Sequence, residues 1–214
     1  MATLRAVVEI EPWADEYTPW PIEKTEPLRW EVLNGSTASA TIGTAMARLA
    51  RWCQPEELDV DYEPTAAEAL QWIAAADYLV ISAGIQASDA DPDADADADP
   101  DADAGPETIV NPGCCADLEG WRAWPDTWLG HPAPQIEQIA DGMLIREDKK
   151  SQSPVMIAAG TLPGLLAGVR DDLIAFLHTA ERWITATVAD PELAAAVIAN
   201  IDRHVIVTAP LDQR

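Results

Sequence analysis

Two adjacent thiols, Cys114 and Cys115, and the loop histidine His131 are the residues whose types best suit metal or nucleophilic chemistry. Zinc sites usually space their cysteines by two or more residues so that both thiolates reach one ion, whereas adjacent side chains diverge. Asp117 and Asp126 lie nearby, but carboxylates are minority ligands for zinc. We therefore expect no metal site and favour a turn in which one thiol faces the core. A reactive thiol at the start of a short helix is the remaining option, although no basic side chain adjoins it in sequence.

His131 lies between Gly130 and Pro132 and is the best candidate of the three histidines for a functional role. A lone histidine in a loop is nevertheless more often structural than catalytic. The sequence contains no G-x-S-x-G elbow, no Walker A loop and no G-x-G-x-x-G fingerprint. Acidic residues are so abundant that choosing a catalytic pair among them would be arbitrary. We thus name no catalytic residue and no cofactor, and we keep an enzyme with a site near His131 as an alternative.

The most unusual segment alternates aspartate with alanine or proline from residue 89 to residue 103. Oxygen ligands at alternate positions suit Ca²⁺, and the D-x-D-x-D start of an EF-hand loop occurs several times. However, the glycine that such a loop needs at its sixth position is missing in every register; counting from Asp99, Ala104 stands there. We interpret residues 89–106 as a disordered, self-repelling insertion that acts as a solvated spacer. Electrostatic docking of this segment on a basic partner is the alternative.

The chain has nine tryptophans against one phenylalanine and three tyrosines, and several of the tryptophans fall in expected loops. One group surrounds Pro125, and another lies in a proline-rich loop over residues 11–27. Tryptophan is enriched at the centres of protein interfaces, so these rings are candidate anchors for a partner. The alternative, which we favour for the rings taken singly, is that they cover an open sheet edge as a minor core. The predicted binding residues are Trp121, Trp124, Asp126, Trp128 and His131, with Trp13 and Trp20 next.

The net charge of −24, from 37 acidic and 13 basic residues, limits the partners of this protein. Binding of nucleic acid requires clustered lysines and arginines that neutralise phosphates, and this chain has too few of them. An acidic protein instead attracts basic protein surfaces. No apolar run approaches the roughly 20 residues of a membrane span, and no apolar signal core follows Met1. Together with the odd number of cysteines, these features predict a cytoplasmic protein in a reducing compartment.

Hydrophobic spacing, caps and turn residues predict the elements that must position these groups. Strands are expected over residues 4–10, 28–33, 78–83 and 109–110, with a hairpin over 135–147 and a short final strand over 204–208. Helices are expected over residues 39–53, 65–76 and 161–188, with a short helix over 115–124 and a last helix that starts after Asp190. Thr65 with Glu68 has the spacing of a capping box, Thr161 is expected to cap its helix, and Asp141-Gly142 is a hairpin turn.

The mixture of strands and helices, without a regular βαβ repeat, predicts an α+β fold. We expect a mostly antiparallel sheet with helices packed on one face, in a single domain over residues 1–214 that contains the acidic insertion 89–106. The leading hypothesis for function is a module that binds a basic partner protein and masks or inhibits it, as an immunity protein or an antitoxin does. The alternatives are the enzyme with a site near His131 and a nucleic-acid mimic whose carboxylates are spaced like phosphates.

Overall fold

The architecture comes from a computed structural model of the chain. It describes residues 1–10, 18–22, 29–59, 62–89, 108–113, 116–127, 129–147 and 153–211. Within these ranges the chain forms two antiparallel sheets and four α-helices, which confirms the expected α+β class. One hydrophobic core contains buried residues of both sheets and of all four helices. The single-domain organisation stays a prediction.

The larger sheet is centred on β1 (Thr3–Ile10), whose side chains are buried on both faces towards its end. The spatial order is β2 (Arg29–Val32), β1, β3 (Ala83–Ser88) and β4 (Ile109–Val110), and every pairing is antiparallel. The strands expected over residues 4–10, 28–33 and 109–110 are therefore confirmed. β1 is therefore an inner strand of the sheet, with a hydrogen-bonded neighbour along each edge.

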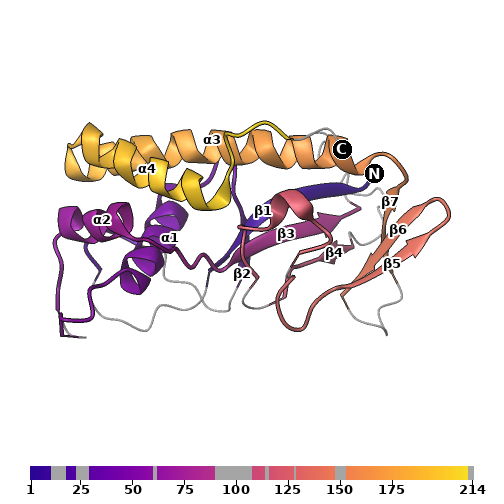
Figure 1. Ribbon diagram of the computed structural model, residues 1–214, viewed down its shortest axis with the longest axis horizontal. Coiled ribbons are helices and arrows are strands. Elements are labelled where there is room, and N and C mark those ends of the chain that lie inside the picture. Colours follow the sequence, from indigo (N-terminus) through magenta and orange to yellow (C-terminus); the bar gives the residue numbers. More distant parts are fainter. Residues whose placement is uncertain are drawn as a thin grey trace, which may run out of the picture.

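The helices pack on one face of this sheet. They are α1 (Ser39–Trp52), α2 (Ala66–Ala75), α3 (Leu162–Val188) and α4 (Pro191–Val205). Figure 1 shows α3 running the length of the molecule above β1, with α4 folded back along it and α1 and α2 at one end. The stripe predicted for α3 is its buried face, from Leu166 to Ile184. Met46, Leu173 and Ile201 meet Val8 around one cavity, so α1, α3 and α4 cover the same face of β1.

The smaller sheet contains the expected hairpin, β5 (Gln135–Ile139) and β6 (Gly142–Arg146), together with a third strand, β7 (Val155–Ala158). Gly142 closes the hairpin with φ +147, and a Cβ there would lie 2.0 Å from the carbonyl oxygen of Ile157. Only glycine tolerates this conformation and this close approach. The predicted hairpin is confirmed, but its two-residue turn is Ala140-Asp141, because Gly142 is already the first residue of β6 and pairs with Ile139. The third strand, β7, was not expected.

Three local predictions are wrong. The strand expected over residues 78–83 starts only at Ala83, because the ladder with β1 aligns Thr3 with Ser88 and ends at Val8. The final strand over 204–208 is absent: Val205 ends α4, and Ile206 takes the left-handed conformation that terminates the helix. The helix expected over 115–124 is reduced, in the described residues, to one 3-10 turn, Trp121–Ala123.

Of three predicted helix caps, two are confirmed and one is wrong. Thr65 and Glu68 form both hydrogen bonds of a capping box at the start of α2. Thr161 does not cap α3, because its hydroxyl donates a 2.8 Å hydrogen bond to the carbonyl of Ala158 in the preceding turn. The Asp190 carboxylate does cap α4, as expected, by accepting hydrogen bonds from two backbone amides.

The acidic segment joins two adjacent strands. Asp89 and Thr108 are hydrogen-bonded to each other, through the backbone at 3.2 Å and through the Asp89 carboxylate at 2.8 Å. Residues 90–107, which hold most of the aspartate run, lie outside the described residues. The chain therefore leaves the sheet and returns to it at one place, between β3 and β4.

Candidate protein-binding groove

Three of the predicted binding residues are core residues. Trp20, Trp121 and Trp124 are each exposed by 4% or less. The indole N–H of Trp121 donates a 2.8 Å hydrogen bond to the carbonyl of Val205, and that of Trp20 donates one of 2.7 Å to Gly43. Buried rings of this kind present no surface to a partner, which corrects the expectation that they are anchors. Their placement agrees with the alternative interpretation, in which the rings serve the core.

The other predicted binding residues are not brought together. Asp126 and His131 are exposed, and Trp13 and Trp128 lie outside the described residues. The His131 imidazole makes no hydrogen bond to any described residue, which counts against a catalytic site there. Cys114 and Cys115 also lie outside the described part of the chain.

The exposed aromatic rings are elsewhere. Trp52, the last residue of α1, is 66% exposed, and Tyr78 is 64% exposed. From the sequence, Trp52 was expected in the core or at its edge, and Tyr78 was expected in a buried strand over residues 78–83. The sequence does contain an indication that Trp52 is exposed. This residue lies off the apolar stripe of its helix, which consists of Ile42, Met46, Leu49 and Cys53.

These rings line a groove of about 310 Å³ that we call the Tyr78 groove. Its floor is formed by residues 78–82, which we call the crossing segment because it runs from α2 to β3 (Figure 1). Trp52 forms one wall, and residues 116–119 form the other. His204 and Val205, at the end of α4, complete the lining.

His204 is fixed in this lining by contacts at both ring nitrogens. Nδ1 lies 2.9 Å from the carbonyl of Asn200, and Nε2 lies 3.1 Å from the carbonyl of Asp77. The Tyr78 ring meets the imidazole edge-on, with centroids 6.4 Å apart. The start of the crossing segment is therefore tied to α4 by side-chain contacts, and the exposed Tyr78 ring is held at the rim of the groove.

Carboxylates line the opposite wall. Asp117 is half-buried and accepts a 3.0 Å hydrogen bond from the backbone N–H of Glu119, whose own side chain is exposed. Neither carboxylate forms an ion pair with a described residue. The groove thus combines aromatic surface with uncompensated negative charge.

Several arginines bind backbone carbonyls and form no ion pair with the groove carboxylates. Arg48 donates to Glu9, Arg203 to Ala76, and both Arg122 and Arg170 to carbonyls of residues 206–210. The three lysines lie outside the described residues. These arginines keep their positive charge, but the chain has 37 acidic residues against 13 basic ones, so negative charge dominates.

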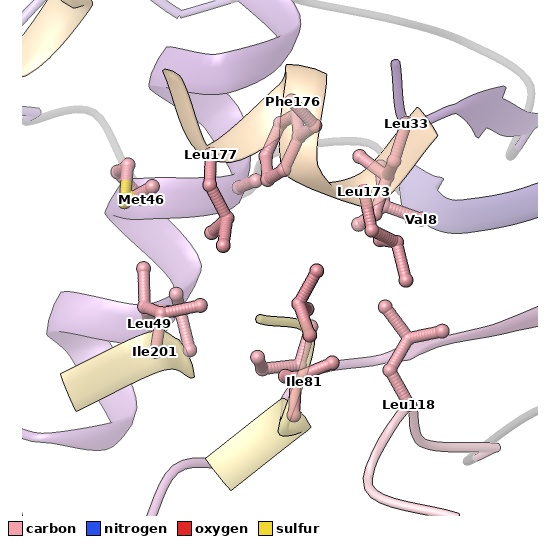
Figure 2. A pocket seen from close by; sticks show the side chains of 13 residues that line it. Val8, Leu33, Met46, Leu49, Ile81, Leu118, Leu173, Phe176, Leu177 and Ile201 are labelled. Atoms are coloured by element: carbon pink, nitrogen blue, oxygen red, sulfur yellow. The ribbon is translucent and has the colours of Figure 1, made fainter. Parts of the chain in front are cut away.

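A small apolar cavity lies beneath the groove. Figure 2 shows side chains of β1, α1, α3 and α4 directed into it. Ile81 and Leu118 line both the cavity and the groove. Its volume is about 30 Å³ and no polar atom lines it. This is room for about one water molecule, but a water needs polar partners. We therefore assign ligand binding to the open groove and not to this cavity.

The chain matches no protein-family model, no curated protein and no solved structure. Among the residues that the structure describes, no group of three or more His, Cys, Asp or Glu side chains is arranged to hold a metal ion. No helix in that part of the chain has the length and apolar character needed to cross a membrane. The Tyr78 groove is therefore defined by its own geometry and charge.

Proposed function

We propose that this protein is a cytoplasmic binding module that docks on a basic partner protein and masks or inhibits it, in the manner of an immunity protein or antitoxin. The observation that carries the proposal is the Tyr78 groove, where Trp52 and Tyr78 face solvent beside the unpaired carboxylates of Asp117 and Glu119. Aromatic anchors with negative charge beside them suit lysine and arginine side chains.

Docking would proceed in two physical steps. The net charge of −24 attracts a basic surface over distances limited by salt screening, which raises the association rate. A cationic side chain of the partner then stacks on Trp52 or Tyr78 while its charge meets the carboxylates of the opposite wall. The first step sets the salt dependence of binding, and the second sets the residence time of the complex.

The test is a pull-down from native lysate at low and high salt with three forms of the protein. The aromatic variant carries Trp52→Ala and Tyr78→Ala, and the charge variant carries Asp117→Asn and Glu119→Gln. Asparagine at 117 keeps an acceptor for the Glu119 amide, so the turn is preserved. We expect a stoichiometric basic protein to bind the unaltered chain and to be weakened at least tenfold by either variant, because buried aromatic anchors contribute about 2 kcal/mol or more.

The smaller sheet supplies matched controls. Asp141→Asn with Glu147→Gln removes the same charge from exposed positions at the hairpin, and Met156→Ala removes an exposed apolar side chain from β7. These controls should retain the partner. Equal loss in the controls, or no basic partner at low salt, would refute the proposal.

A further variant in the same pull-down tests whether the acidic segment contributes to docking. Asp89 and Thr108 are paired across the end of the sheet, so residues 90–107 can be replaced by Asn-Gly, which suits a two-residue hairpin. Retention of the partner by this chain would identify the segment as a spacer. Loss of the partner would transfer the docking role from the Tyr78 groove to the aspartate run.

A further inference from the structure

We propose that the partner enters the Tyr78 groove as an extended strand and adds to the crossing segment through main-chain hydrogen bonds, with lysine or arginine at alternate positions. This inference rests on the proposed function and specifies its mode of recognition. Strand addition is a common way to bind an extended peptide, because the backbone supplies affinity while alternate side chains supply specificity.

The crossing segment has the side-chain alternation of a strand. Its side chains alternate, since Leu79 is buried at 6% exposure and Ile81 is partly buried, whereas Tyr78 and Val80 face solvent. The backbone groups of Leu79, Val80 and Ile81 make no hydrogen bond to any other described residue. An apolar extended stretch with free amides is a template for another strand.

The hydrogen bonds that flank this stretch show which edge is open. The Ser82 carbonyl accepts a 2.9 Å bond from Glu9 of β1, and the next amide, that of Ala83, donates a 3.1 Å bond to Ala116 on the opposite side. Successive residues of a strand direct their N–H and C=O groups to opposite edges. The backbone groups of Leu79 and Ile81 therefore face the same side as Ala83, towards the wall formed by residues 116–119.

Among the described residues, no strand pairs with this edge of the crossing segment. β4 pairs with β3 only at Ala87 and Ser88, at the far end of that strand. Residues 116–119 approach the edge at Ala83, and the Tyr78 groove separates them from the crossing segment farther on. A strand lying in the groove would continue the sheet at the place where its own strands stop.

The charge of the groove selects the side chains of the added strand. Alternate residues on its solvent face would lie beside Tyr78 and Val80, where long cationic side chains can stack on the Tyr78 ring and reach Asp117 or Glu119. Acidic residues at these positions would meet like charge. We therefore expect an alternating basic and apolar segment to bind, and an alternating acidic one to be rejected.

Amide hydrogen exchange measured by NMR tests the proposal on the full chain. The probes are the hexapeptide Arg-Val-Arg-Val-Arg-Val, the same peptide N-methylated at every amide, and Glu-Val-Glu-Val-Glu-Val. The basic peptide should slow exchange of the Leu79 and Ile81 amides at least tenfold and leave Val80 unchanged, because only alternate amides face the added strand. The N-methylated and acidic peptides should produce no protection.

The outcomes separate this inference from the function on which it rests. Binding of the basic peptide without protection at Leu79 and Ile81, or equal binding of its N-methylated form, would overturn strand addition and leave a side-chain-mediated groove intact. Failure of the basic peptide to bind would likewise overturn strand addition, even if the pull-down identifies a groove-dependent basic protein. Absence of any basic partner in the pull-down would instead refute the function itself.

Discussion

Individual polar side chains join segments that lie far apart in this chain. The buried amide of Asn200, on α4, donates hydrogen bonds of 2.7 Å and 3.0 Å to the carbonyls of Ile73 and Ala76 at the end of α2. Its oxygen accepts from Arg203, which also donates to Ala76. These contacts satisfy carbonyls that a helix end leaves without intrahelical partners. Because Ala76 directly precedes Asp77 and the crossing segment, they also fix the start of the groove floor.

We predict that Asn200→Leu lowers the free energy of unfolding by about 1–3 kcal/mol, because the Ile73 carbonyl would lose its 2.7 Å bond and keep only the 3.4 Å bond from the Ala76 amide. Urea denaturation measures the change. Gln71→Leu, at an exposed position of α2, is the control and should change stability by less than about 0.5 kcal/mol. Equal midpoints for Asn200→Leu and the unaltered chain would show that the amide contributes no net stability.

The Cys53 thiol provides a prediction about pH. Burial raises its pKa from 9.0 to about 11, since the thiolate loses solvation there. At pH 8 the thiolate fraction of the folded chain should be about 100-fold lower than in the unfolded chain. In a Cys114→Ser, Cys115→Ser background, the rate of reaction with a disulfide reagent should rise tenfold per pH unit to about pH 11. A plateau near pH 9 for the folded chain would contradict the burial effect; the same chain in urea is the reference.

At the scale of elements, short-range sequence patterns set several boundaries correctly. The capping box of α2 includes hydrogen bonds of 2.9 Å from the Thr65 amide and 2.7 Å from the Thr65 hydroxyl to the Glu68 carboxylate. Tyr62 donates a further one of 3.0 Å. These bonds, with the Thr65 hydroxyl first, lower the pKa of Glu68 below its usual 4.5. Such interactions form within a few residues, so the sequence alone predicts them.

We predict that Thr65→Ala lowers the free energy of unfolding by about 1 kcal/mol at pH 7. Because the folded pKa of Glu68 is lowered, its contribution is present above its ordinary pKa of 4.5 and is lost as pH falls through the folded value. The difference between Thr65→Ala and the unaltered chain should therefore shrink in acid. Urea midpoints at pH 7 and pH 3 test this, with exposed Glu63→Gln as the control. A difference that does not change with pH would rule out the carboxylate contribution.

At the scale of the whole molecule, the net charge of −24 opposes folding through self-repulsion. Because the chain has 37 acidic residues and only 13 basic ones, most of its carboxylates cannot have a cationic partner within the chain. The same imbalance that would attract a basic partner therefore weakens the free protein. A basic partner or added salt should relieve this repulsion.

We predict that raising NaCl from about 0.02 M to about 0.3 M increases the free energy of unfolding by on the order of 1 kcal/mol, because screening shortens the range of repulsion. Thermal or urea denaturation at each salt concentration measures the increase. The chain with residues 90–107 replaced by Asn-Gly lacks most of the aspartate run and should respond less. Equal responses of the two chains would show that repulsion from this run does not limit stability.

Features that depend on neighbouring residues could be predicted from the sequence: the α+β class, the capping box at Thr65, the hairpin over residues 135–147 and the long amphipathic helix α3. The hairpin turn itself lies one residue earlier than expected, at Ala140-Asp141. Tertiary structure alone decided which part of the apolar run from Tyr78 onward became a strand, because β1 pairs with Ala83–Ser88 and not with the residues before them. It also decided that Trp121 is buried while Trp52 is exposed. Burial and strand pairing depend on segments distant in sequence, and local pattern carries no information about which of them will meet. The Tyr78 groove is lined by segments of this kind, which are distant in sequence and adjacent in the fold.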